Sequence, residues 1–277
     1  MKTIHDLLIS EYSIPKHEIE IILAHILNKK RNELYFIREH RLSKPEVELF
    51  NDILENRKAN QPLQYLLGST EFYGYTFSVN ESVLVPRPET ELLVEKTIQK
   101  IKTKHYSLPI LGIELGVGSG AISISLLKEL PNLKMIAFDI SRRALETAKH
   151  NAIINNVDER LFLCHADSFD FISPKHRLDF IISNPPYLPR SDIQTMPKDV
   201  LNEPHIALFS KAPNEFYSLC LEAIKNGLLA REGFFIAEGD PRYLNSIAEE
   251  FRAENIFKNI NIIKDLTDKD RILEIDL

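Results

Sequence analysis

The sequence predicts an α/β protein whose mostly parallel sheet is preceded by a small helical region. Three observations lead to this prediction. From residue 109 onward, short apolar runs typical of buried strands alternate with segments of helical periodicity. Residues 1–68 carry helical patterns instead. Glycines and acidic residues follow several of the apolar runs, at the strand ends where parallel sheets bind their ligands.

Composition excludes several classes of protein. The 277 residues are 44% hydrophobic and 27% charged, as in an ordinary globular chain of one large or two smaller domains. A net charge of −6 argues against wide, sequence-independent phosphate binding but leaves room for a local basic patch. No direct nucleic-acid substrate is expected. The two cysteines lie outside any CxxC pattern, which predicts a reducing, cytoplasmic setting without disulfides. No apolar run approaches the roughly 18 residues of a membrane span, and the scattered histidines predict no metal site.

Residues 1–68 are expected to form a helical domain. Ser43, with Glu46 three residues later, has the pattern of a helix N-cap, and Gly68 closes a short helix over 63–67. A helical apolar stripe includes Ile19, Ile22, Leu23, Leu34, Phe36 and Ile37. Basic and acidic residues nearly balance here, which argues against a nucleic-acid-binding arm.

Residues 71–79 alternate apolar and polar positions around Gly74, which predicts a β-hairpin, and residues 69–85 are expected to form a β-hairpin linker. The remaining residues, 86–277, form the α/β domain. Its strands are expected at 109–115, 133–139, 160–165, 177–183 and 233–238, with a terminal antiparallel pair at 257–265 and 271–276. Its helices are expected at about 119–130, 142–155 and 214–229.

The most informative motif follows the fourth predicted strand and consists of Asn184, Pro185, Pro186 and Tyr187. Proline has no N–H for a sheet ladder, so this segment forms a stiff loop whose carbonyl groups face outward. The side-chain oxygen of Asn184 and the carbonyl of Pro185 could accept both hydrogens of an NH₂ group, while Tyr187 covers its planar face. The motif resembles the Asp/Asn-Pro-Pro-Tyr signature of methyltransferases that act on planar amino nitrogens.

A glycine-rich loop after the first strand of this sheet is the predicted cofactor site. It contains Gly116, Val117, Gly118, Ser119, Gly120 and Ala121. The spacing also fits the GxGxxG/A dinucleotide pattern with Asp139 as the ribose acid, so NAD is a competing ligand.

Three features favour S-adenosylmethionine over NAD. Glu114 lies two residues before Gly116, where its charge repels a pyrophosphate but attracts an ammonium or sulfonium group. Asp167 and the Ser168 N–H could bind adenine, and the Asn-Pro-Pro-Tyr motif including Asn184 follows a strand of the same sheet. Asp139 would then accept two hydrogen bonds from the ribose hydroxyls. Glu114, Asp139 and Asp167 follow or end successive strands. A ligand that all three contact explains them better than three separate strand-end caps.

One more segment is a candidate for the edge of the site. Pro86, Arg87, Pro88 and Glu89 precede a predicted helix through residues 92–98. Pro88 suits a first helical position and Glu89 the positive end of the helix, so a capped helix is the simplest interpretation. Because a second proline is more than a helix start requires, Arg87 and Glu89 are also candidate substrate contacts.

Together these motifs make the chain similar to the HemK/PrmC family. The resemblance extends over most of the chain. It rests on the helical amino-terminal part and on residues 61–68, 71–74, 85–91, 114–121, 138–141, 183–188, 203–204, 207–208, 264–266 and 270–271. It implies a five-helix substrate-binding domain, a hairpin linker and a class I (Rossmann-like) methyltransferase domain with a seven-stranded sheet. It also implies transfer of a methyl group from S-adenosylmethionine to the glutamine amide nitrogen in the Gly-Gly-Gln motif of peptide chain release factors.

Two positions depart from the family pattern. Ser168 stands where an aromatic residue often follows the acid, with Phe169 next to it, and Glu238-Gly239-Asp240 is a looser version of the usual end of the fifth strand. Two other functions remain as alternatives. The Asn-Pro-Pro-Tyr chemistry suits adenine N6 or cytosine N4 as well as glutamine, so a nucleic-acid adenine N6-methyltransferase is the first. A non-catalytic binding platform is the second.

Overall fold

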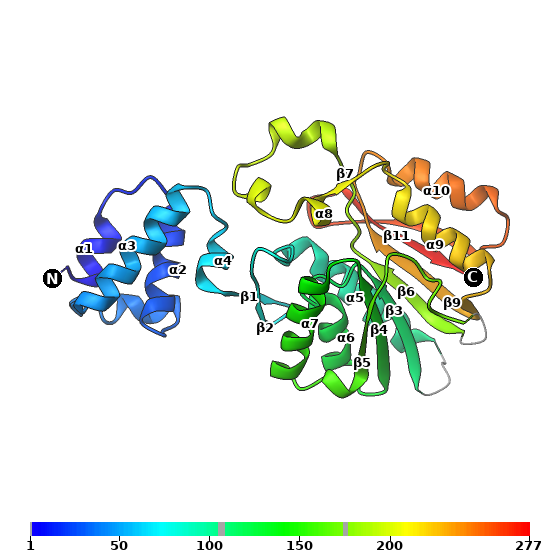
Figure 1. The fold of residues 1–277 in the computed structure, drawn as a ribbon, viewed down its shortest axis with the longest axis horizontal. Helices are drawn as coiled ribbons and strands as arrows, with labels where there is room; N and C mark the ends of the chain where they lie inside the picture. Colours follow the sequence, from blue (N-terminus) through cyan, green and yellow to red (C-terminus); the bar gives the residue numbers. More distant parts are fainter. Residues whose placement is uncertain (1, 105–108, 174–176) are drawn as a thin grey trace. The chain divides into compact units, whose positions relative to one another are not determined.

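The computed structural model describes residues 2–104, 109–173 and 177–277, and its chain divides into two compact units (Figure 1). Unit 1 comprises Met1–Ser69 and Pro197–Asn202, and unit 2 comprises Thr70–Met196 and Glu203–Leu277. Met1, with which the predicted helical domain begins, lies outside the described residues.

Unit 1 is built from helices around its own apolar core. Their bounds are α1 Ile4–Ile9, α2 Lys16–Ile26, the 3₁₀ helix η1 Arg31–Tyr35, α3 Lys44–Lys58 and α4 Leu63–Leu67. Ser43 and Glu46 form the capping box of α3, and Gly68 ends α4 with a φ of 72°. Leu34 is fully buried, but Phe36 is 85% exposed, so the expected apolar stripe is wrong at that position. The reason is that η1 ends at Tyr35, which breaks the α-helical period on which the stripe depends.

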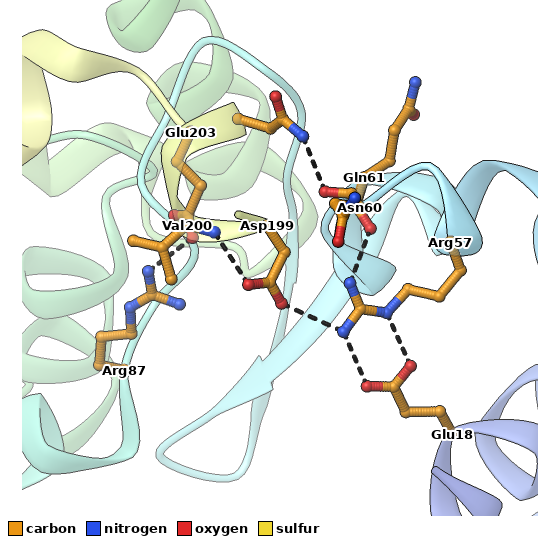
Figure 2. Close-up of polar contacts among 9 residues, drawn as sticks. Glu18, Arg57, Asn60, Gln61, Arg87, Asp199, Val200 and Glu203 are labelled. Carbon is orange, nitrogen blue, oxygen red and sulfur yellow. Dashed lines mark hydrogen bonds and ion pairs between the residues drawn. The ribbon is translucent and has the colours of Figure 1, made fainter. Parts of the chain in front are cut away.

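A segment remote in sequence also belongs to unit 1. Arg57 of α3 donates through Nε and Nη2 to the carboxylate of Glu18, at 2.7 and 2.9 Å, and through Nη2 to Asp199 Oδ2 at 3.1 Å (Figure 2). Asn202 Nδ2 donates to the Asn60 carbonyl at 2.8 Å. These bonds hold residues 197–202 against helices that precede them by well over a hundred positions. No local pattern in the sequence signals such contacts.

Unit 2 contains a seven-stranded sheet of order β10-β11-β9-β6-β3-β4-β5. The bounds are β3 Ile110–Leu115, β4 Leu133–Asp139, β5 Leu161–His165, β6 Leu178–Ser183, β9 Leu229–Glu238, β10 Asn259–Lys264 and β11 Asp270–Asp276. The pairs β3–β4, β4–β5, β3–β6 and β6–β9 are parallel, whereas β11 runs antiparallel to both of its neighbours. The predicted α/β class with a mostly parallel seven-stranded sheet is confirmed.

Helices cover both faces of this sheet (Figure 1). Helices α5 Glu91–Thr103, α6 Ala121–Glu129 and α7 Arg142–Ile154 share one apolar cluster with the sheet, and α9 Glu215–Lys225 and α10 Leu244–Ala253 share the other. Strands buried on both faces have near-continuous apolar sequences, which is why β3, β4 and β6 were predictable to within one residue. Strand β9 begins four residues before its predicted start.

A hairpin of β1 Ser69–Phe72 and β2 Tyr75–Ser78 stands between the helical region and the sheet in the sequence. Phe72 and Phe77 pack into the core beside α5, α6 and α7. Asn151 of α7, fully buried, accepts from Ser78 N at 2.8 Å and donates to the Ser78 and Ser119 carbonyls at 2.9 and 2.8 Å. One side chain therefore ties the hairpin to the loop that follows β3.

Several short elements between β6 and α9 were not predicted. They are β7 Leu188–Pro189, η4 Arg190–Thr195, η5 Val200–Asn202, α8 His205–Leu208 and β8 Phe209–Ser210, joined by a two-stranded parallel β7–β8 ladder. Elements of two to six residues are too short to show a period in the sequence. Across the described part of the chain, no helix has the length and apolar character needed to cross a membrane.

The Arg57–Asp199 contact leads to a prediction about residues 197–202. Asp199→Asn removes the charge that the Arg57 guanidinium contacts, so backbone amides in this segment should exchange with solvent several-fold faster. Hydrogen exchange followed by mass spectrometry measures this directly. Glu48→Gln, which alters an exposed carboxylate on α3, is the matched control and should leave the segment unchanged. Identical exchange in the two variants would show that the ion pair does not hold the segment.

Candidate active site

The register of the sheet aligns four candidate site residues at the carboxyl ends of adjacent parallel strands. Leu115 of β3 pairs with Phe138 of β4 and Ser183 of β6, and Ser183 pairs with Ala237 of β9. The next residue in each parallel strand therefore belongs to the same edge of the sheet. Those four residues are Gly116, Asp139, Asn184 and Glu238. After β5 the chain crosses back to the other side of β3 and continues the sheet with β6, so the strand order reverses between β3 and β6. Open parallel sheets bind ligands at such a switch point.

The glycine-rich loop connects β3 to α6 at this edge. Gly116, Gly118 and Gly120 have φ values of 73°, 52° and 83°, in the left-handed region that favours glycine. A Cβ added to Gly120 would lie 2.8 Å from Ile124 Cδ1, so the isoleucine side chain would have to move in addition to the backbone strain that a φ of 83° imposes. A Cβ on Gly116 or Gly118 would meet nothing within 4 Å. At those two positions the absent side chains leave open space beside the backbone, as a bound ligand needs.

Four backbone N–H groups of this loop donate within the protein. Gly116 N and Val117 N both donate to the Phe138 carbonyl, at 2.9 and 3.1 Å, and Gly120 N donates to the Val117 carbonyl at 2.8 Å. Gly118 N donates to Asp139 Oδ2 at 3.0 Å. A pyrophosphate binds at such loops through backbone N–H groups that are directed at it. The loop is therefore poorly suited to the dinucleotide alternative, while its open space remains available to an uncharged or cationic group.

Glu114, the second-last residue of β3, is a buried acid that precedes this loop and is 1% exposed. Its Oε2 accepts from the backbone N–H and the hydroxyl of Ser123 on α6. Burial raises the pKa of Glu114 to about 8, and the Ser123 donors oppose that shift only in part. A cation bound nearby would stabilise its ionised form.

Asp139, at the end of β4, is oriented by backbone donors. Oδ2 accepts from Gly118 N and Oδ1 from Ser141 N, at 3.0 and 2.9 Å, and burial raises the pKa of its carboxyl group. Each carboxylate oxygen has a second lone pair for a ligand hydroxyl. Asp139 thus lies where the glycine loop and β4 meet, as a diol-binding acid must.

The three predicted residues after β5 lie in different environments. Asp167 is exposed, and Ser168 Oγ donates to Asp170 Oδ2 at 2.9 Å. Phe169 is 7% exposed and packs edge-on against Phe138, with ring centroids 5.1 Å apart. The ring of Phe169 therefore belongs mainly to the core.

The Asn-Pro-Pro-Tyr segment follows β6 directly. Asn184 is half-buried, and its Nδ2 donates to Thr90 Oγ1 at 2.9 Å. Pro185 is buried, and the Tyr187 hydroxyl donates to Glu238 Oε1 at 3.0 Å. Burial and the adjacent Glu238 carboxylate raise the pKa of Tyr187, which therefore stays a neutral donor. The loop is held by its side chains as well as by its prolines.

Arg87 and Glu89 differ in their surroundings. Arg87 Nη2 lies 2.5 Å from Oε1 of Glu203 (Figure 2). Glu203 is 4% exposed, and its carboxylate also accepts from Val85 N at 2.9 Å. Arg87 thereby neutralises a buried carboxylate, a structural task that sequence reasoning did not assign to it. Glu89 is exposed at the start of η2 Pro88–Thr90.

Sequence reasoning missed Thr90, Asn151, Glu203 and the side-chain role of Glu238. Thr90 could have been noticed because a threonine between two glutamates is a weak choice for helix propensity alone. Glu238 was noticed only as the end of β9. No group of three or more His, Cys, Asp or Glu side chains within residues 2–104, 109–173 and 177–277 is arranged to hold a metal ion.

Family models match both parts of the chain. A model described as "PrmC N-terminal domain" matches residues 4–68, and one described as "Methyltransferase small domain" matches residues 89–208. Together with the Rossmann-like sheet, these matches place the chain among proteins that carry a methyltransferase domain.

Curated relatives narrow this class. A release factor glutamine methyltransferase of Aquifex aeolicus is 35% identical, with 95% of this chain and 91% of the relative covered. One of Leptospira interrogans is 36% identical, with 95% and 94% covered. A bifunctional methyltransferase of Rickettsia typhi is 36% identical over 95% of this chain, which spans 54% of that relative's length. The chain thus covers about half of the bifunctional relatives it matches. It belongs to the release factor glutamine methyltransferase family.

Solved structures share the fold at low identity. The hMettl16 catalytic domain in complex with MAT2A 3'UTR hairpin 1 superposes with a TM-score of 0.59 at 15% identity, covering 91% of this chain and 90% of that one. A human methyltransferase 10 domain containing protein gives 0.55 at 16% identity, covering 80% and 97%. At these identities the likeness extends to the fold alone.

The raised pKa of Glu114 predicts a pH-dependent stability. Between about pH 4.5 and 8 the native state holds a proton on Glu114 that the unfolded chain has lost, so stability falls as pH rises through this window. Glu114→Gln keeps an acceptor for Ser123 and cannot ionise. The free energy of unfolding of wild type relative to this variant should decline by up to about 1.4 kcal/mol per pH unit. Urea titrations at pH 5, 6, 7 and 8 measure the difference, and a pH-independent difference would contradict the prediction.

Proposed function

We propose that this protein transfers a methyl group from S-adenosylmethionine to the side-chain amide nitrogen of the glutamine in the Gly-Gly-Gln motif of peptide chain release factors. The observation that carries the proposal is the pairing of Ser183 with Leu115, because Asn184 and Pro185 follow the first of these residues and the glycine loop follows the second. The names of the relatives from Aquifex and Leptospira supply the class of substrate.

Residues at the ends of β3, β4 and β5 have side chains and backbone groups that complement the parts of the methyl donor. When bound, S-adenosylmethionine supplies an electrophilic methyl group on a sulfonium centre. Glu114 and the glycine loop suit its cationic end, Asp139 suits the ribose diol, and the segment of Asp167 and Ser168 suits the adenine. The loop residues in this assignment are Gly116, Val117, Gly118, Ser119 and Gly120, with Asn184 bordering both ligands.

The acceptor nitrogen is held by Asn184 and Pro185. The side-chain oxygen of Asn184 and the Pro185 carbonyl each accept one hydrogen of the glutamine NH₂, while Pro186 stiffens the loop and Tyr187 covers the amide plane. The lone pair of an amide is delocalised, so its nitrogen attacks poorly unless its orientation is fixed. Positioning of this kind lowers a barrier by several kcal/mol, up to roughly 7–11 kcal/mol in favourable cases. The nitrogen becomes acidic once alkylated, so no dedicated base is required.

We assign substrate recognition to residues 1–68, with residues 69–85 as a linker and 86–277 as the catalytic domain. Arg87 and Glu89 lie within three residues of Thr90 in the segment before α5, and Thr90 contacts Asn184. Exposed Glu89 is suited to contact a substrate backbone. Arg87 is suited mainly to holding the buried Glu203, with one-third of its side chain still exposed.

Methyl transfer to a release factor tests the proposal directly. Purified protein with labelled S-adenosylmethionine should label a class 1 release factor and fail to label the same factor when the Gly-Gly-Gln glutamine is replaced by alanine. Labelling of duplex DNA or RNA instead would establish the nucleic-acid alternative. Binding of S-adenosylmethionine without transfer to either substrate would establish the non-catalytic platform.

Removal of the Asn184 side chain should separate chemistry from cofactor binding. Asn184→Ala removes one of the two acceptors for the substrate NH₂ but leaves the glycine loop, Glu114 and Asp139 intact. We expect kcat to fall at least about a hundredfold, with the Kd for S-adenosylmethionine within about threefold of wild type. Single-turnover kinetics and calorimetry measure the two quantities. An equal loss of rate and cofactor affinity would refute this division of roles.

A further inference from the structure

Asn184 can accept a hydrogen bond from a substrate only if its side-chain oxygen, and not its NH₂ group, faces that substrate. The two ends of a side-chain amide have nearly the same shape, so packing alone does not choose between them. The choice depends on the groups that hydrogen-bond the other end. In this structure that end contacts Thr90, since Asn184 Nδ2 lies 2.9 Å from Thr90 Oγ1.

The Thr90 hydroxyl has one hydrogen and cannot donate it twice. Thr90 Oγ1 lies 2.7 Å from Oε2 of Glu238, and both residues are buried, at 4% and 1% exposure. Burial raises the pKa of Glu238, but the hydrogen bonds from the Thr90 and Tyr187 hydroxyls and the charge of Arg271 oppose that shift and favour the ionised form. A carboxylate accepts hydrogen bonds and never donates them, so the Thr90 hydrogen is committed to Glu238. The lone pair of Thr90 Oγ1 can then only accept, and the NH₂ group of Asn184 is the donor that it faces. With the Asn184 amide reversed, its side-chain oxygen would face the lone pairs of Thr90 Oγ1, and two acceptors would repel each other.

Glu238 is held firmly enough to impose this direction. Its other carboxylate oxygen, Oε1, accepts from the Tyr187 hydroxyl at 3.0 Å, and its backbone carbonyl accepts from the Tyr217 hydroxyl. Its Cα pairs with Ile272 in the antiparallel ladder of β9 and β11. Backbone and side chain of Glu238 are thus both fixed at the strand edge.

We propose that Thr90 and Glu238 are positioning residues, forming a directed Glu238–Thr90–Asn184 relay that aims the Asn184 side-chain oxygen at the NH₂ group to be methylated. The inference rests on the proposed function for the identity of that group, and on the hydrogen bonds alone for the orientation of Asn184. It also gives a reason for the short helix η2 before α5, which places Thr90 within hydrogen-bonding distance of both Asn184, after β6, and Glu238, at the end of β9. Tyr187 is positioned by the same carboxylate.

Three substitutions test the relay through steady-state kinetics. Thr90→Val keeps the shape of the side chain but removes its hydroxyl, and kcat should fall at least about tenfold with unchanged KM for the release factor and Kd for S-adenosylmethionine. Glu238→Gln can donate to Thr90 and so allows the reversed amide; we expect a similar loss in kcat. Thr90→Ser restores the hydroxyl and should recover most of the wild-type rate.

Thr97→Val is the matched control. Thr97 is equally buried, and its hydroxyl donates to the Leu93 carbonyl within α5, away from Asn184. A structural role for Thr90 would give both valine variants lower melting temperatures with unchanged kcat. The relay requires a loss of kcat that only Thr90→Val shows.

Nuclear magnetic resonance provides a readout that needs no substrate. In the wild-type protein, one Asn184 side-chain amide proton, assigned by its disappearance in Asn184→Asp, should exchange slowly with solvent. Thr90→Val should abolish that protection, and Thr97→Val should not. If the release factor is not methylated but this protection behaves as described, the proposed function fails and the relay stands. An Asn184 amide that is unaffected by Thr90→Val, or an unchanged kcat in that variant, overturns the relay.

Discussion

The parallel register of β3, β4, β6 and β9 is the constraint on which the rest of the site depends. Because Leu115, Phe138, Ser183 and Ala237 form one row of paired residues, the residues that follow them reach the sheet edge together. A slip of one residue in any strand would invert its side chains between the two faces, moving apolar groups out of the core. The two apolar clusters that sandwich the sheet therefore enforce the alignment of Gly116, Asp139, Asn184 and Glu238. Core packing and site geometry have the same cause.

Buried carboxylates give this edge its electrostatic character. Glu114, Glu203 and Glu238 are each no more than 4% exposed, a costly arrangement unless hydrogen bonds or charges compensate. Each has its own compensation: Glu114 keeps its proton up to about pH 8 and accepts from Ser123, Glu203 contacts the Arg87 guanidinium, and Glu238 accepts from the Thr90 and Tyr187 hydroxyls. The groups that satisfy these acids are thereby immobilised. Fixed dipoles of this kind stabilise a reaction without reorganising during it.

The features that could be predicted from the sequence are those that depend on residues close together in the chain. Ser43 with Glu46, and Gly68 after Leu67, are local signals that act within one helical turn, and the structure contains both caps. The apolar runs of β3 and β6 were equally visible because burial on both faces leaves few polar positions. Phe36 was misassigned because η1 interrupts the helical period, and the short elements of residues 188–210 had no period to detect. The attachment of residues 197–202 to Arg57 depends on partners more than a hundred residues apart.

By itself, the sequence determined the α/β class, the order of the strands along the chain and the candidate residues at their ends. These features follow from periodicity, turn chemistry and motif spacing, all of which act over a few residues. Only the tertiary structure decided what those residues contact. It committed the N–H groups of the glycine loop to the protein's own acceptors, gave Arg87 the buried Glu203 as partner, and linked Asn184 through Thr90 to Glu238. The physical reason is that the direction of a hydrogen bond is set by both of its partners, and Thr90 and Glu238 lie 148 residues apart in the chain.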